Sequence, residues 1–141
     1  MKNMVCSVVG MIGSAIAGIF GGWSSGLTTL LIFMAIDYIS GLVVAGVFHA
    51  SPKSETGALE SRAGWKGLVR KGMTLVIVLI GCRLDMLLGL NYIRDALVIA
   101  FILNEVISIT ENAGLMGVPM VKPLKDAIEL LKDRSEEPVE K

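Results

Sequence analysis

Several ionisable side chains lie inside long apolar stretches of this sequence, where a charge is costly unless it is paired or hydrated. Asp37 stands alone in the first of these stretches. Arg83 and Asp85 share a second stretch. Glu105 lies in a third, next to the polar but neutral Asn104. Carboxylates and a guanidinium placed in this way can form a buried ion pair, carry protons or ions along a hydrated path, or act as a switch that responds to assembly.

The depths of three of these residues favour an interaction between them. If each stretch is a helix across a bilayer, Asp37, Arg83 and Glu105 lie within about one helical turn of a common depth. A buried ion pair that fixes the register of the helices is one interpretation. A water-lined path, or a switch that depends on assembly, is the other, and the sequence leaves both open.

Residue types needed for common catalytic centres are scarce. The chain has one His and two Cys, too few for a His and Cys metal cluster. It contains no P-loop, dinucleotide fingerprint or nucleophile elbow. Thirteen basic and thirteen acidic side chains cancel, so no net field attracts nucleic acid. We therefore expect no enzyme, no cofactor, no metal and no nucleic-acid partner.

The elements that position the charged residues are long apolar segments, and they predict an all-α polytopic membrane protein. Of 141 residues, 53% are hydrophobic and 18% charged. A run of 19 residues rises about 28 Å as a helix, close to the thickness of the bilayer hydrocarbon. Four segments of about this length are predicted to span: 4–22, 27–49, 72–90 and 94–112.

The predicted organisation is a transmembrane domain over 1–118 and a cytoplasmic tail over 119–141. In the tail, Pro123 suits a first helical turn, and apolar residues follow it at helical spacing. These residues are Leu124, Ala127, Ile128 and Leu131. The pattern predicts a short amphipathic cytoplasmic helix over 123–134.

Basic residues gather in three segments, and this sets the expected orientation. Lys2 precedes the first span, five basic residues lie in the loop 50–71, and five follow the last span. The positive-inside rule therefore places both termini and this loop in the cytoplasm. From Leu59 onward the loop either forms a short helix on the anionic inner leaflet or stays a plain basic loop. The basic residues at this membrane surface would be Arg62, Lys66, Arg70 and Lys71.

Small residues recur at every fourth position in the first two spans. The first span contains Gly10, Ser14, Gly18 and Gly22 at this spacing. In the second span, Gly41 and Ala45 continue the spacing from the aspartate. Such stripes let helix backbones approach closely in lipid. They predict helix packing within one subunit, self-association between subunits, or both.

Three blocks in matching order along nearly the whole chain resemble the toxin-secretion/phage-lysis holin family. They read GGWSSGLTTLLIFMAIDYISGLVVA, GWKGLVRKG and ILNEVISITENAGLMGVPMVKPLKDAIELLK. The first holds Asp37, Tyr38, Ser40 and Gly41, and the second holds Gly64, Lys66, Gly67 and Lys71. The third holds Asn104, Glu105, Ser108, Glu111, Asn112, Gly117 and Pro119.

The resemblance implies a small phage or prophage protein that permeabilises the bacterial cytoplasmic membrane. Such proteins accumulate harmlessly and then assemble into homo-oligomeric lesions that release a cell-wall hydrolase (an endolysin), or in some relatives a toxin. Direct contact with that functional partner is not required. Family members are often drawn with three spans, which is the alternative to four here. The family offers no catalytic residue.

Two other functions fit the same pattern. A small proton-coupled four-helix exporter would use Asp37 or Glu105 as its proton-coupled carboxylate. Against it, both have Arg83 as a potential neutralising partner, and aromatic residues for a cation cage are few. A passive membrane anchor would instead recruit a cytoplasmic partner through the helix 123–134.

Overall fold

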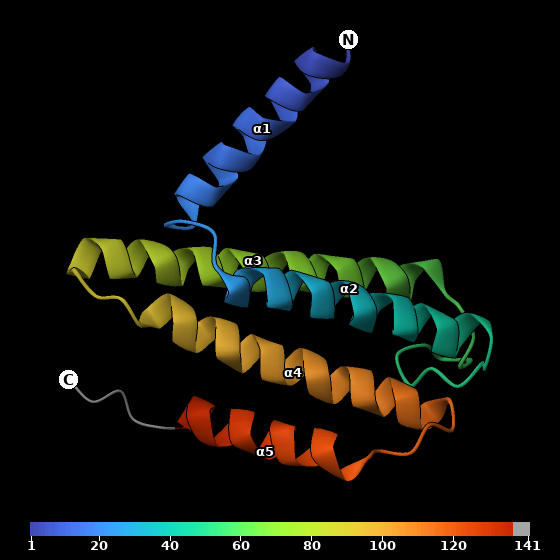
Figure 1. The fold of residues 1–141 in the computed structure, drawn as a ribbon. Coiled ribbons are helices and arrows are strands. Elements are labelled where there is room, and N and C mark those ends of the chain that lie inside the picture. Colours follow the sequence, from blue (N-terminus) through green and yellow to red (C-terminus); the bar gives the residue numbers. More distant parts are fainter. Residues whose placement is uncertain (137–141) are drawn as a thin grey trace.

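The computed structural model of the chain describes residues 1–136, and within them the fold is all-α, as predicted. Three helices form a bundle centred on α4, a fourth runs beside α4, and α1 projects away from the bundle (Figure 1). In chain order the five helices are α1 (Lys2–Ile19), α2 (Ser25–Gly46), α3 (Ser61–Leu88), α4 (Ile93–Leu115) and α5 (Lys122–Glu136).

Local sequence explains where α2 begins and α3 ends. The Ser24 side chain accepts a hydrogen bond from the Leu27 amide (3.2 Å) and so caps the first turn of α2. At the other boundary, Gly89 ends α3 in the left-handed conformation, with φ of 67°. Gly21 and Gly22 also have positive φ, which turns the chain sharply between α1 and α2.

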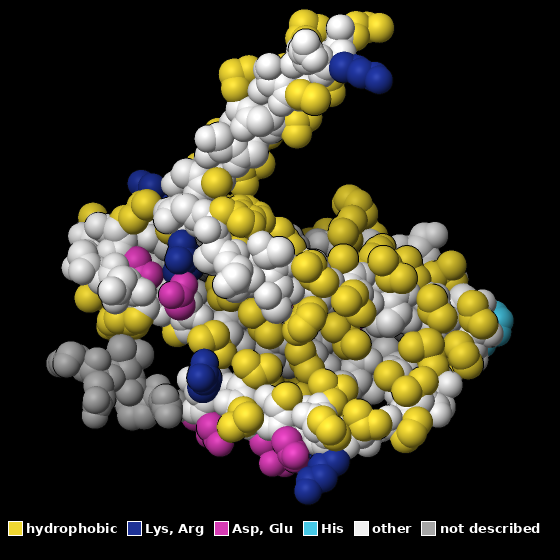
Figure 2. Space-filling model, in the orientation of Figure 1, with side chains coloured by type: hydrophobic (Ala, Val, Ile, Leu, Met, Phe, Trp, Pro, Cys, Tyr) yellow, Lys and Arg dark blue, Asp and Glu magenta, His cyan; other side chains and the backbone are white. Residues whose placement is uncertain are grey.

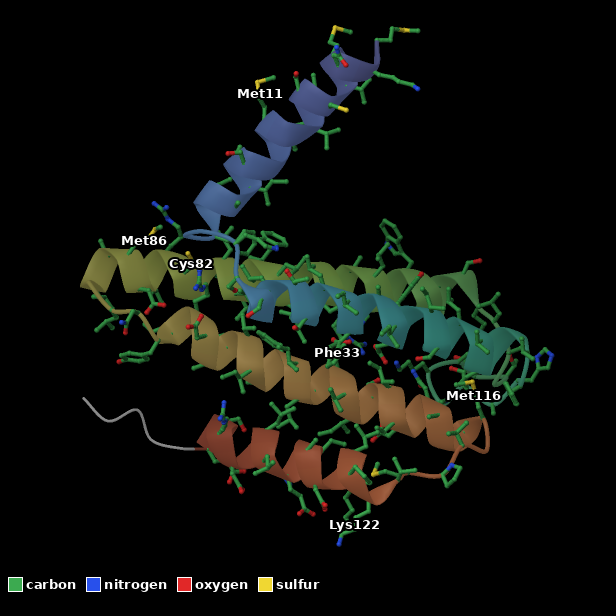
Figure 3. All side chains as sticks on the ribbon, viewed as in Figure 1. Met11, Phe33, Cys82, Met86, Met116 and Lys122 are labelled. Carbon is green, nitrogen blue, oxygen red and sulfur yellow. The ribbon has the colours of Figure 1, made fainter. Side chains whose placement is uncertain are left out.

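The core of the bundle is apolar and joins three helices. Leu30 of α2 and Val78 of α3 are completely buried, and both belong to one apolar cluster with Val98 and Ile102 of α4. Figure 3 shows Phe33 inside the bundle, where it packs against the same cluster. Because α4 contributes to both contacts, its position determines the register of α2 and α3.

Helix α1 is different, because none of its described residues is buried against the bundle. Figure 3 shows Met11 pointing away from the rest of the molecule. Among the described helices, α1 and α2 are long and apolar enough to cross a membrane. That α3 and α4 also cross the membrane stays a prediction.

The basic end of the loop 50–71 differs from the sequence-based expectation. Instead of a separate surface helix or a plain loop, residues from Ser61 onward are the first turns of α3, which continues without a break to Leu88. Its 28 residues extend about 42 Å. These turns are held by packing that the sequence does not reveal: a Cβ at Gly64 would lie 3.5 Å from the Tyr38 hydroxyl of α2.

Candidate functional site: a buried charge network beside a polar cavity

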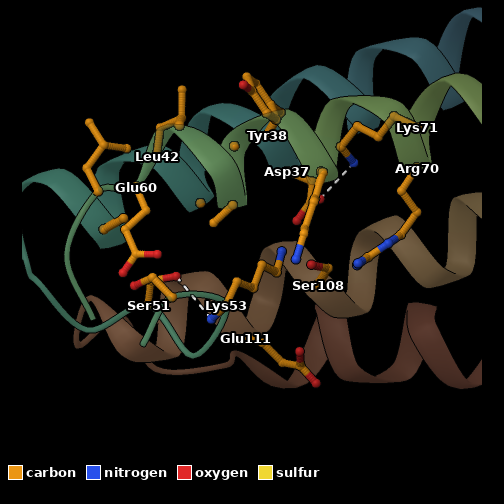
Figure 4. A pocket seen from close by; sticks show the side chains of 18 of the residues that line it. Asp37, Tyr38, Leu42, Ser51, Lys53, Glu60, Arg70, Lys71, Ser108 and Glu111 are labelled. Atoms are coloured by element: carbon orange, nitrogen blue, oxygen red, sulfur yellow. Dashed lines mark hydrogen bonds and ion pairs between the residues drawn. The ribbon is translucent and has the colours of Figure 1, made fainter. Parts of the chain in front are cut away.

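A lysine from α3 joins carboxylates from α2 and α4 at the centre of the bundle. Lys71 Nζ donates to Asp37 Oδ2 at 2.7 Å and to Glu105 Oε2 at 2.5 Å. The three side chains are 14%, 8% and 7% exposed, respectively. Figure 4 marks the contact between the lysine and the aspartate. The contact connects all three helices of the bundle through one ammonium group.

Asn112 completes the network from α4. Its side-chain nitrogen donates to Ser40 Oγ (2.8 Å) and to Asp37 Oδ1 (3.2 Å), and lies 3.3 Å from the Asp37 main-chain oxygen. Both oxygens of the aspartate therefore have a donor, as a buried carboxylate requires. Sequence reasoning did not assign this asparagine a role, although it lies seven residues after Glu105, two helical turns along the same face.

Arg83, the pairing partner that one of the two interpretations of the sequence assigned to these carboxylates, does not contact them in the structure. Arg83 is exposed, and its nearest polar contact is Met86 Sδ at 3.4 Å. It lies twelve residues beyond Lys71, about 18 Å farther along α3. Lys71, expected at the membrane surface, occupies the buried position because α3 starts at residue 61 rather than at 72. If the predicted third span is extended as a helix toward the N-terminus from residue 72, it includes this lysine and places it beside the carboxylates.

Asp85 is buried but belongs to a different contact. Its carboxylate accepts hydrogen bonds from the amides of Ile93 (3.0 Å) and Arg94 (2.9 Å), the first residues of α4. It satisfies donors that a helix N-terminus leaves free, and its charge suits the positive end of the helix dipole. The Arg94 guanidinium in turn donates to the main-chain oxygen of Phe20 at 2.9 Å and holds the turn that follows α1.

A polar cavity of about 400 Å³ lies next to the network, between α2, α3, α4 and the turn that precedes α3. Its lining includes the network carboxylates and lysine, Asn104, and the predicted surface residues Lys66 and Arg70. Figure 4 shows Lys53 and Arg70 directed into it from opposite sides of Ser108. Arg62 is exposed and is not among the lining residues. The cavity could hold water next to buried charges, but the described residues contain no group of three potential metal ligands.

The small-residue positions fall into two groups. Gly41 and Ala45 pack inside the bundle: a Cβ at Gly41 would meet Asn112, and Ala45 is buried. In α1, by contrast, a Cβ at Gly10 or Gly18 would meet nothing within 4 Å in the described part of the chain. Gly22 is equally open, and Ser14 is exposed.

These features define a small all-α protein with membrane-length apolar helices and a paired charge network in its core. The model of the bacteriophage holin family matches residues 14–133, and the chain belongs to this family. The family consists of non-enzymatic membrane proteins, so the predicted resemblance and the prediction that the chain is not an enzyme are both confirmed.

Relatives match over most of their own length. An uncharacterized protein of Halalkalibacterium halodurans is 41% identical over 128 residues, covering 86% of this chain and 89% of the relative. An uncharacterized 14.9 kDa protein of Clostridium perfringens is 34% identical over 125 residues (87% and 89%). A probable holin of Bacillus phage phi105 is 30% identical over 116 residues (82% and 80%). No solved structure matches the chain.

Proposed function

We propose that this protein acts as a holin, which oligomerises in the bacterial cytoplasmic membrane and forms lesions that release a cell-wall hydrolase or a toxin. The observation that carries the proposal is the family match over residues 14–133, together with the relative named as a probable holin. The proposed lesion is built from copies of this chain, and its cargo passes without a dedicated binding site.

The open face of α1 supports self-association. This helix is long and apolar enough to cross a membrane, and its small residues meet no neighbour within the described part of the same chain. In lipid, where small residues let backbones approach closely, a helix from a second copy is the natural partner for this face. The neighbours of Gly41 and the burial of Ala45 support packing within one subunit for these two residues instead.

The buried network supports a stable subunit before assembly. An ammonium between two carboxylates holds α2, α3 and α4 in one register, and separating the helices would expose unpaired charges. The same contacts disfavour the exporter alternative, because Asp37 and Glu105 are already occupied by Lys71 and are not free to bind a cationic substrate.

The proposed topology has four spans with both termini in the cytoplasm, supported by the distribution of basic residues. Cysteine labelling at Ser25, Asn91 and Ser135 in a cysteine-free background tests it. Before lesions form, Ser25 and Asn91 should react from outside the cell and Ser135 only from inside. Reaction of Ser25 and Ser135 from the same side would contradict this topology.

The functional test is expression in bacteria with and without a co-expressed wall hydrolase, while a dye reports the membrane potential. Abrupt loss of potential, with lysis only when the hydrolase is present, supports the holin function. Graded drug resistance would identify an exporter, and neither effect would identify an anchor. Gly18→Leu should delay the collapse at normal protein abundance, because it separates the α1 faces. Val9→Leu, on the opposite side of α1, is the matched control and should not.

A further inference from the structure

The outer surface of the bundle has two sides of different chemistry. In the middle of α2 and of α3, over residues 32–39 and 73–80, the exposed positions form apolar stripes. The stripe on α2 consists of Ile32, Ile36 and Ile39, and that on α3 includes Met73, Val76, Ile77 and Ile80. Figure 2 shows hydrophobic side chains spread over the face of the bundle in that view. These stripes are suited to contact with lipid.

The side formed by α4 and α5 is polar. The exposed stripe of α4 carries Asn104 and Glu111 between small residues such as Ala100. Helix α5 has eight charged residues among fifteen, and all eight are exposed. Figure 2 shows acidic and basic side chains along this edge of the molecule.

Helix α5 lies alongside α4 rather than beyond its end (Figure 1). Ile128 and Leu131 are partly buried against the apolar cluster of the bundle, so the apolar face of α5 points inward and its charged face outward. Fifteen residues extend about 22 Å, most of the thickness of the bilayer hydrocarbon. If α4 spans the membrane, the charges of α5 lie at membrane depth, where contact with lipid is excluded.

We propose that the α4–α5 side faces water and forms the wall of the lesion, while α2 and α3 face lipid. This inference rests on the proposed holin function and assigns the surface that lines the opening. Within this side, helix α5 carries four basic and four acidic residues, so the helix has no net charge. A neutral wall of mixed charge suits the passage of folded proteins of either sign.

The same geometry makes the docking of α5 dependent on assembly. Within the described residues, no hydrogen bond or ion pair joins α5 to α4, and the contact is apolar. Before assembly, lipid surrounds the subunit and α5 leaves α4 for the membrane surface, where its charges are hydrated. When copies assemble and water enters, α5 docks on α4.

Spin labels on the purified full chain in vesicles of bacterial lipid test this assignment. Nitroxides are placed at Ala100 of α4, Lys132 of α5 and Ile36 of α2, and collisions with a water-soluble nickel complex and with oxygen are measured. Release of a trapped dye from the same vesicles reports the lesion. At a low protein-to-lipid ratio, without dye release, the Ala100 label should collide with oxygen. At a high ratio, with release, it should collide with nickel, whereas the Ile36 label stays in lipid.

The outcomes separate the assignment from the holin function itself. An Ala100 label that collides with nickel at both ratios places the α4–α5 hairpin outside the membrane and overturns the proposal. A label that stays in lipid while dye is released overturns it too, but leaves the holin function intact. Absence of dye release at every ratio contradicts the holin function. If the Ala100 label then also never collides with nickel, the assignment of the α4–α5 side to the wall of the lesion is overturned as well.

A pair of neighbouring substitutions tests the docking of α5. Leu131→Ser removes an inward contact, whereas Leu130→Ser alters a side chain that is 66% exposed. Leu131→Ser should lower the fraction of molecules with α5 docked on α4 about tenfold, and dye release should decrease to a similar extent. Leu130→Ser should leave release unchanged. Equal release from the two variants would overturn the docking.

Discussion

Replacing Lys71 by methionine should destabilise the bundle more than any change at an exposed charge. At an effective dielectric constant of 20, each of its contacts, at 2.7 and 2.5 Å, supplies about 6 kcal/mol of gross attraction, which largely offsets the cost of removing the charges from water. Without the ammonium, two buried carboxylates face each other unpaired. We expect a loss of about 3–5 kcal/mol, the usual cost of breaking a buried ion pair.

Thermal unfolding of the purified protein in detergent measures this loss. For a chain of this length, it corresponds to a decrease in Tm of about 10–15 °C. Arg83→Met is the matched control on the same helix and should change Tm by little, because Arg83 is exposed. Adding Asp37→Asn and Glu105→Gln to Lys71→Met should recover part of the loss, since no unpaired charge remains. A Lys71→Met variant as stable as Arg83→Met would refute the role of the network.

Three further changes probe the packing around the network. Asp85→Ala should cost about 1–2 kcal/mol by uncapping α4, measured by denaturant unfolding in detergent, and a value near zero would contradict the cap. Gly81→Leu should cost about 1–3 kcal/mol, because even a Cβ would clash with Leu97 Cδ1, whereas Gly72→Leu on the same helix meets open space and should be neutral. Asn112→Leu should cost about 1–3 kcal/mol by leaving buried acceptors without a donor, and unchanged unfolding would show that water replaces it.

The sequence by itself determined the helical class and the approximate position of most helices. Predicted segments at 4–22, 27–49 and 94–112 match α1, α2 and α4 to within a few residues, because the length of an apolar run is a local property. The amphipathic tail helix is equally predictable from the sequence, since its apolar residues recur at helical spacing. Asp37 and Glu105 stood out for the same reason, as isolated charges in apolar surroundings.

Tertiary structure decided which group pairs with these carboxylates. The choice between Lys71 and Arg83 depends on where α3 begins and how it is rotated against α2 and α4, and helical periodicity sets neither. Asp85 resembled a member of the network but caps α4, because only the turn between α3 and α4 brings it to the free amides. Each of these partnerships joins residues from different helices, so packing between helices selects them, and no single segment encodes that packing alone.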